Sequence, residues 1–161
     1  MRVHVKPRHR LGPLIYSAMV GEHAFDIRQS RYRLRSPCDE WHFYWPTIGE
    51  IVLQIPVFRP RVKPVWNVML DGELICQGEL RQSFIPSRHD GIYWHFQEDI
   101  LFERSWPRMK MHHALRDQTK KVLACWNPAC YGVIGVIRPA LPRDTMVAVF
   151  GIMAISLLAS Y

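Results

Sequence analysis

The feature that most constrains this fold is the end of the chain, where seventeen consecutive residues, 145–161, carry no charge. The polar groups in this run belong to Thr145, Ser156, Ser160 and Tyr161. A helix that is apolar on every side lies in a protein interior or in lipid, and we expect a chain of 161 residues to be too small to surround one. The run reaches the lower limit of about 17–25 residues for a spanning helix. The sequence therefore predicts a C-terminal membrane anchor, with the main domain cytoplasmic.

A second uncharged run, residues 122–137, precedes the last one, and the break between them contains Arg138 and Arg143. The two runs could form a short membrane hairpin. A single anchor is favoured because it keeps both arginines on the cytoplasmic side. Two other arrangements, a long buried strand pair and a tail that docks into an oligomer, would leave the protein soluble in the cytoplasm.

Residues 105–121 are predicted to form a basic amphipathic helix. Ser105 is a suitable N-cap, and Pro107 is tolerated in a first helical turn. Met111 and Leu115 recur at helical spacing. The surrounding basic residues are Arg108, Lys110, Arg116, Lys120 and Lys121. Such a helix beside a membrane anchor would lie on anionic headgroups.

The middle of the chain has the pattern of β-strands. Residues 48–58, 65–70, 73–80 and 92–102 are rich in aliphatic and aromatic side chains, and we predict a four-stranded antiparallel meander. The pair Asp71-Gly72 between the second and third runs indicates a tight hairpin, because a type I′ turn needs positive φ at both central residues.

Two earlier strands, residues 14–20 and 24–28, are expected to extend this sheet or to pack across it. The predicted fold class is therefore α+β. A predominantly antiparallel β-domain covers residues 1–104, and the basic helix and an apolar C-terminal region, residues 122–161, follow it.

The charge of the chain is unevenly distributed. The formal net charge is +7, and residues 1–63 alone hold eleven Lys and Arg against five Asp and Glu. Residues 101–121 also have a basic surplus. A surplus of this kind fits nucleic acid, an anionic membrane surface or an acidic protein partner. Composition does not choose among these partners.

Two aromatic and basic segments are candidate binding surfaces. Residues 31–35 alternate Arg with apolar side chains, which places three guanidinium groups on one face of a strand. The tripeptide Trp-His-Phe occurs twice, near residues 41 and 94. Exposed aromatics and Arg form protein contact surfaces or stack on single-stranded nucleic acid, whereas the alternative is ordinary strand packing. The candidate binding residues are Arg31, Arg33, Arg35, Trp41, His42, Trp45, Trp94 and His95.

The sequence contains one candidate metal site and no recognisable catalytic motif. Cys125 and Cys130 are spaced as in some zinc sites, and His112 with His113 could complete four ligands. The alternative is that both cysteines are buried structural thiols. No nucleophile elbow, phosphate-binding glycine loop or dinucleotide fingerprint is present, which favours a non-enzymatic protein that uses no cofactor.

Together these patterns favour a membrane-associated interaction or adaptor protein. Its basic, aromatic-rich β-domain would bind a protein partner beside an anionic membrane. The alternative hypothesis is a soluble nucleic-acid-binding protein that uses the Arg-rich N-terminal half of the chain.

Overall fold

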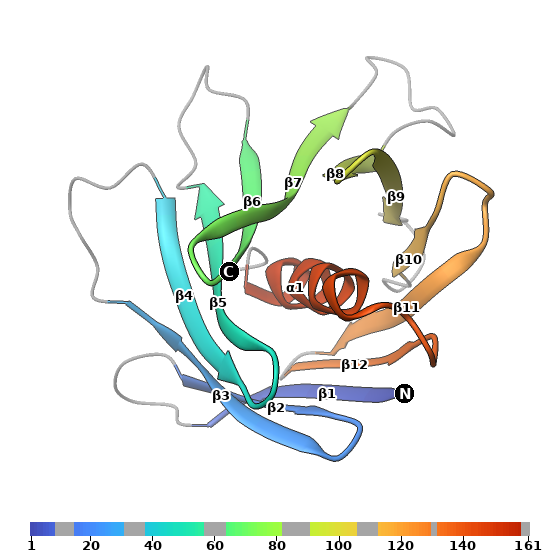
Figure 1. The fold of residues 1–161 in the computed structure, drawn as a ribbon. Helices are drawn as coiled ribbons and strands as arrows, with labels where there is room; N and C mark the ends of the chain where they lie inside the picture. Colours follow the sequence, from blue (N-terminus) through green and yellow to red (C-terminus); the bar gives the residue numbers. More distant parts are fainter. Residues whose placement is uncertain are drawn as a thin grey trace.

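The computed structural model describes residues 1–8, 15–30, 38–56, 64–81, 91–105, 113–129 and 132–158. Within these ranges, twelve β-strands are followed by one α-helix (Figure 1). The strands are β1 (Arg2–Pro7), β2 (Ile15–Val20), β3 (His23–Gln29), β4 (Cys38–Trp45), β5 (Gly49–Pro56), β6 (Val65–Leu70), β7 (Glu73–Arg81), β8 (Gly91–Phe96), β9 (Asp99–Ser105), β10 (His113–Arg116), β11 (Val122–Ala129) and β12 (Gly132–Ile137), and the helix is α1 (Arg143–Leu158).

The strands form a closed antiparallel barrel in which each strand pairs with its neighbours in the chain. The first and last strands complete the ring, with Arg2 opposite Val136 and Val5 opposite Val133. Side chains alternate across the wall: Val3 and Val5 are buried inside, whereas the residues between them are exposed. Because the ring is closed, each described strand has a paired neighbour on both sides, and the shortest pairing, between β3 and β4, consists of Arg28 with His42 and Gln29 with Trp41.

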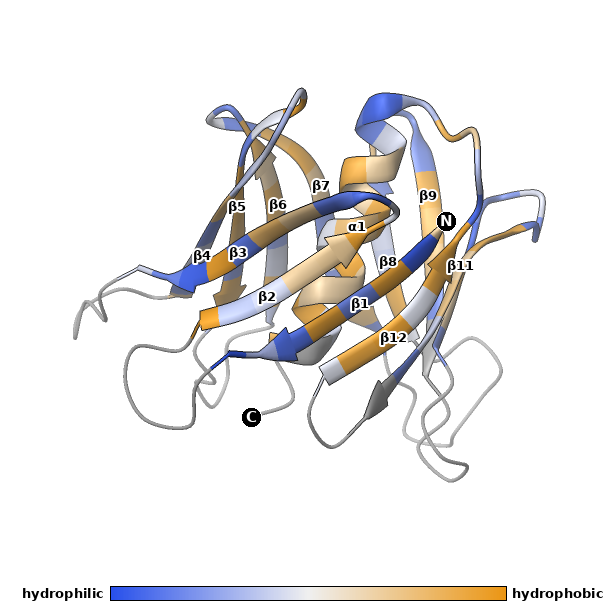
Figure 2. Cartoon of the chain, turned by 90° about the horizontal axis from the view of Figure 1, so that it is seen from below, coloured by the Kyte–Doolittle hydropathy of each residue, from blue (hydrophilic) through white to orange (hydrophobic). Residues whose placement is uncertain are grey.

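Helix α1 runs through the middle of the barrel (Figures 1 and 2). Val149, Phe150, Ile152, Met153 and Ala154 each have 0% of their surface exposed. Barrels of about eight strands are filled by their own side chains, and those of sixteen or more enclose a channel. A twelve-stranded ring lies between these sizes, and a helix of about 10–12 Å diameter supplies the apolar volume its interior lacks.

Aromatic side chains pack around the centre of this helix. The ring of Phe150 lies 5.4 Å from Phe25, 5.5 Å from Phe43 and 5.5 Å from Trp45, each in an edge-to-face arrangement. Such aromatic pairs add about 0.5–1.5 kcal/mol each beyond simple burial. These contacts fix α1 against strands β3 and β4.

The predicted α+β fold class is therefore wrong, and so is the predicted membrane anchor. The apolar tail does form a helix, but the protein encloses that helix in its own sheet. A chain of this size can surround one apolar helix because its strands form a single-layered barrel around that helix. Over the described residues, no helix combines the length and the apolar character needed to cross a bilayer.

The predicted basic helix over residues 105–121 is also wrong where the chain is described, while residues 106–112 lie outside the described residues. Strand β9 extends to Ser105, and β10 pairs with both β9 and β11. Leu115 is buried and Arg116 is exposed, as period-two alternation requires. Asp117 accepts hydrogen bonds from Thr119 Oγ1 at 2.6 Å and from Lys121 N at 2.9 Å, which forms a turn. The apolar run 122–137 is the strand pair β11 and β12.

The central hairpin is confirmed. Strands β6 and β7 meet at Asp71 and Gly72, whose φ angles are 50° and 84°. Asp71 also accepts a hydrogen bond from Glu50 N at 2.9 Å, which ties the turn to β5.

The predicted single strand over residues 92–102 is instead two strands, β8 and β9, because Gln97 turns the chain with a φ of 52°.

Candidate functional site

Charge divides the outside of the barrel into two unlike parts. Strands β10, β11, β12 and β1 are neighbours in the ring, and we call them the basic wall. Their charged residues are Arg2, Lys6 and Arg116, and they contain no Asp or Glu. Strands β4 to β9, here the acidic side, contain seven Asp or Glu and two Arg, and one of these acids, Glu103, is buried inside the barrel. Among the strand residues, the basic wall thus carries net positive charge and the acidic side net negative charge.

The cations of the basic wall are available for an external partner. Arg2, His4 and Lys6 alternate along β1 and are all exposed. Among the described residues, no carboxylate pairs with Arg2 or with Lys6, whereas Arg8 beyond the strand pairs with Asp26 at 2.6 Å. Unpaired cations on one strand attract anionic groups.

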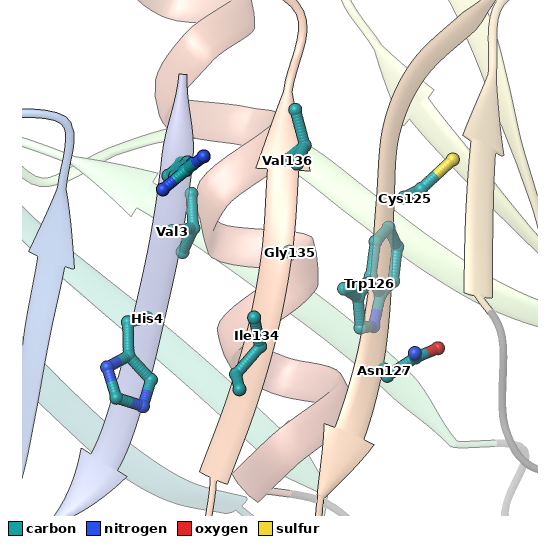
Figure 3. A pocket seen from close by; sticks show the side chains of 9 residues that line it. Val3, His4, Cys125, Trp126, Asn127, Ile134, Gly135 and Val136 are labelled. Carbon is teal, nitrogen blue, oxygen red and sulfur yellow. The ribbon is translucent and has the colours of Figure 1, made fainter.

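A groove of about 500 Å³ lies on this wall, across β1, β12 and β11 (Figure 3). Ile134 and Val136 lie in its centre on β12, and their side chains are 60% and 54% exposed. The groove is bordered on one side by β1 and on the other by β11. The bordering side chains include Arg2, His4, Cys125 and Asn127.

A second depression, of about 410 Å³, adjoins the groove on the other side of β1. It is lined by His4 and Lys6 from β1, by Met19 from β2, whose side chain is 54% exposed, and by Asp26 from β3, whose carboxylate pairs with Arg8. His4 borders both hollows. The basic ridge of β1 therefore has exposed aliphatic side chains on either side.

Inside the barrel, a polar cluster lies where β8, β9 and β10 face α1. The carboxylate of Glu103 accepts hydrogen bonds from Trp94 Nε1 at 2.9 Å and from Ser156 Oγ at 3.0 Å, and it lies 2.9 Å from His113 Nδ1. Glu103 is 1% exposed. Its bond to Ser156 ties α1 to β9. Because these groups satisfy one another, the cluster stabilises the position of the helix.

The aromatic candidates predicted from the sequence lie inside the barrel. Trp41, Trp45 and Trp94 are buried, at 4%, 0% and 0% exposure. Their histidine neighbours point outward: His42 lies 3.4 Å from Glu50, and His95 lies 3.9 Å from Glu79. These five residues therefore do not form one surface. The predicted Arg strip, Arg31, Arg33 and Arg35, lies outside the described residues.

The predicted zinc ligands that can be placed do not converge. His113 faces inward against Trp126, with ring centroids 5.3 Å apart, whereas Cys125 is exposed on the outside. His112 and Cys130 lie outside the described residues. Across the part of the chain that is described, no three His, Cys, Asp or Glu side chains gather as metal ligands.

The remaining buried thiol is not a nucleophile. Burial raises the pKa of Cys76 to about 12, so this thiol stays protonated at neutral pH. The thiolate is the reactive form of cysteine. Cys76 is therefore a small core residue rather than a catalytic group.

No protein-family model, curated protein or solved structure matches this chain. The sequence does contain a signal for the basic wall, since residues 2–7 and 122–137 hold no acidic residue. That signal becomes a surface only through the pairing of β1 with β12, which joins the two ends of the sheet.

Proposed function

We propose that this protein is a non-enzymatic interaction module that binds an acidic partner protein on its basic wall. The observation that carries the proposal is the run of four neighbouring strands with cations and no carboxylate. Such a surface attracts anionic partners and repels cationic ones, which raises the association rate and the specificity.

The filled interior supports an exterior binding site. Residues of α1 occupy the lumen, where a ligand would otherwise enter a barrel of this size. The grooves described above lie on the outer face, next to Arg2 and Lys6. A partner can reach this face without any movement of the core.

The chemistry of the wall favours a protein over single-stranded nucleic acid. Bases stack on exposed aromatic rings, but the large exposed side chains between β2 and β12 are the aliphatic Met19, Ile134 and Val136. In the aromatic segment on which the nucleic-acid hypothesis depends, residues 41–45, Trp41 and Trp45 are buried, and the exposed Tyr44 lies on β4, away from the basic wall. Aliphatic side chains beside cations suit a protein surface that carries both carboxylates and apolar groups.

Binding of fluorescent poly-L-glutamate to the full chain tests the proposal. Reversal of one cation of the basic wall, Arg2→Glu, should weaken the affinity by about tenfold at low salt, because it replaces an attraction with a repulsion. The affinity of the unmodified protein should fall as salt rises. Anisotropy titrations measure both effects.

The matched control is Arg81→Glu, on β7 of the acidic side. It changes the net charge by the same amount, and Arg81 is 51% exposed. This variant should bind poly-L-glutamate as the unmodified protein does. Equal loss in both variants would mean that only net charge matters, and would contradict the proposal. So would tighter binding of a single-stranded oligonucleotide or of phosphatidylserine vesicles than of poly-L-glutamate.

A further inference from the structure

Strand β12 breaks the usual pattern of a solvated barrel wall. Its alternate residues Val133 and Ile137 are buried, as expected, but the outward positions between them are the aliphatic Ile134 and Val136. An antiparallel wall facing water normally carries polar side chains at such positions, as β1 does with Arg2 and Lys6. Adjacent exposed aliphatic residues indicate a contact surface.

The strand register places these aliphatic side chains directly beside the polar residues of β1. Ile134 lies opposite His4, which lies opposite Met19 on β2, so one row across the wall consists of an imidazole between two apolar side chains. The neighbouring row places Val136 opposite Arg2. Rows on one face are about 7 Å apart, and strands are about 5 Å apart, so one short segment can contact all of these side chains.

We propose that the groove on β12 receives the aliphatic side chains of a short acidic segment of the partner, whose carboxylates pair with the cations of β1. This inference rests on the proposed function, and it adds that charge alone does not define the ligand. The recognised segment must combine Asp or Glu with large aliphatic residues.

The closed barrel determines how such a segment binds. With β1 paired to both β12 and β2, the backbone groups of the wall are already used in the sheet. The partner therefore cannot add a strand, and recognition depends on side chains. Affinity then comes from buried aliphatic surface, while the carboxylates supply orientation and selectivity.

A second copy of this chain is a poorer occupant of the groove. The acidic side does carry exposed Leu74 and Ile100 beside Glu73 and Asp99. However, each copy has a net charge of +7, and like net charges oppose self-association. An acidic partner adds no such repulsion.

Two labelled peptides of equal charge test the inference. One mixes glutamate with leucine, and the other has serine in place of leucine. The leucine peptide should bind the full chain about tenfold more tightly or better, because it buries aliphatic surface on β12. The double variant Ile134→Ser/Val136→Ser should remove this advantage and leave binding of the serine peptide unchanged.

The control is Leu74→Ser/Ile100→Ser on the acidic side, where the side chains are 52% and 40% exposed. It should keep the preference for leucine, and thermal unfolding should show that both double variants are folded. Equal affinity for the two peptides would overturn this inference and leave the proposed function intact. Binding of neither peptide would overturn the proposed function itself.

Three other results would also overturn the inference. The first is loss of the leucine preference in the control variant. The second is displacement of the leucine peptide by an oligonucleotide or by phosphatidylserine vesicles at lower concentration than unlabelled peptide. The third is self-association of the protein alone that Ile134→Ser/Val136→Ser abolishes, because the occupant would then be a second copy.

Discussion

At the scale of single residues, Glu103 is the buried acid on which the interior depends. Its carboxylate binds the indole of Trp94 from β8 and the hydroxyl of Ser156 from α1, and it contacts the imidazole of His113 from β10. Burial of a carboxylate lowers stability unless the carboxylate is fully hydrogen-bonded. Removal of the carboxylate also lowers stability, because its buried donors then lack an acceptor. The Glu103 side chain therefore links α1 and its own strand, β9, to the neighbouring strands β8 and β10.

Substitution of this residue should lower stability markedly. Glu103→Ala should reduce the free energy of unfolding by about 2–4 kcal/mol, because it opens a cavity and leaves the buried Trp94 indole without its acceptor. Urea denaturation followed by circular dichroism measures the change. The matched control, Glu79→Ala, removes an acid that is 35% exposed, and should change the free energy by about 0.5 kcal/mol or less. A similar small effect of both substitutions would show that the interior cluster is not stabilising.

At the scale of elements, the hairpins explain why parts of the barrel could be read from the sequence. Asp71-Gly72 supplies two residues that tolerate positive φ, and this turn chemistry identified β6 and β7. The strand β10 was missed because its four residues are too few to display a period of two, while Met111 and Leu115 happen to recur at helical spacing. Local sequence therefore predicts a strand pair where the turn requires residues that tolerate positive φ. It does not predict a short strand such as β10, which is stabilised by pairing with β9 and β11.

The hairpin at Asp71-Gly72 gives a prediction at this scale. Gly72 has a φ of +84°, and a Cβ there would meet no atom within 4 Å. Gly72→Ala should therefore cost about 1–2 kcal/mol of unfolding free energy from backbone strain alone. Gly72→Asn should cost less than half as much, since Asn tolerates positive φ. Thermal unfolding of the two variants measures the difference, and equal losses would argue against a turn of this conformation.

At the scale of the whole molecule, the proposed binding surface arises from closure of the sheet. The basic wall joins the first strand to the last three, and its groove lies where β1 meets β12. Neither the sequence of β1 nor that of β10 to β12 indicates this surface by itself. The sequence did indicate the excess of positive charge and the apolar helix at the end of the chain. It did not indicate that twelve strands would surround that helix, because closure depends on pairing between distant residues.

The same closure explains why an apolar helix requires no lipid. Residues 147–155 fill a lumen that the strands cannot fill by themselves, and the proposed binding surface accordingly lies on the outer face. The proposed function depends on this arrangement, since an emptied lumen would offer an interior binding site instead.

Amide hydrogen exchange of the unmodified protein tests this arrangement most directly. Amides of residues 147–155 should exchange as slowly as those of β1 and β12, through global unfolding only, because the helix cannot leave the closed barrel without opening it. Free exchange of the helix amides while the strands stay protected would contradict the account, because it would place the helix outside the barrel.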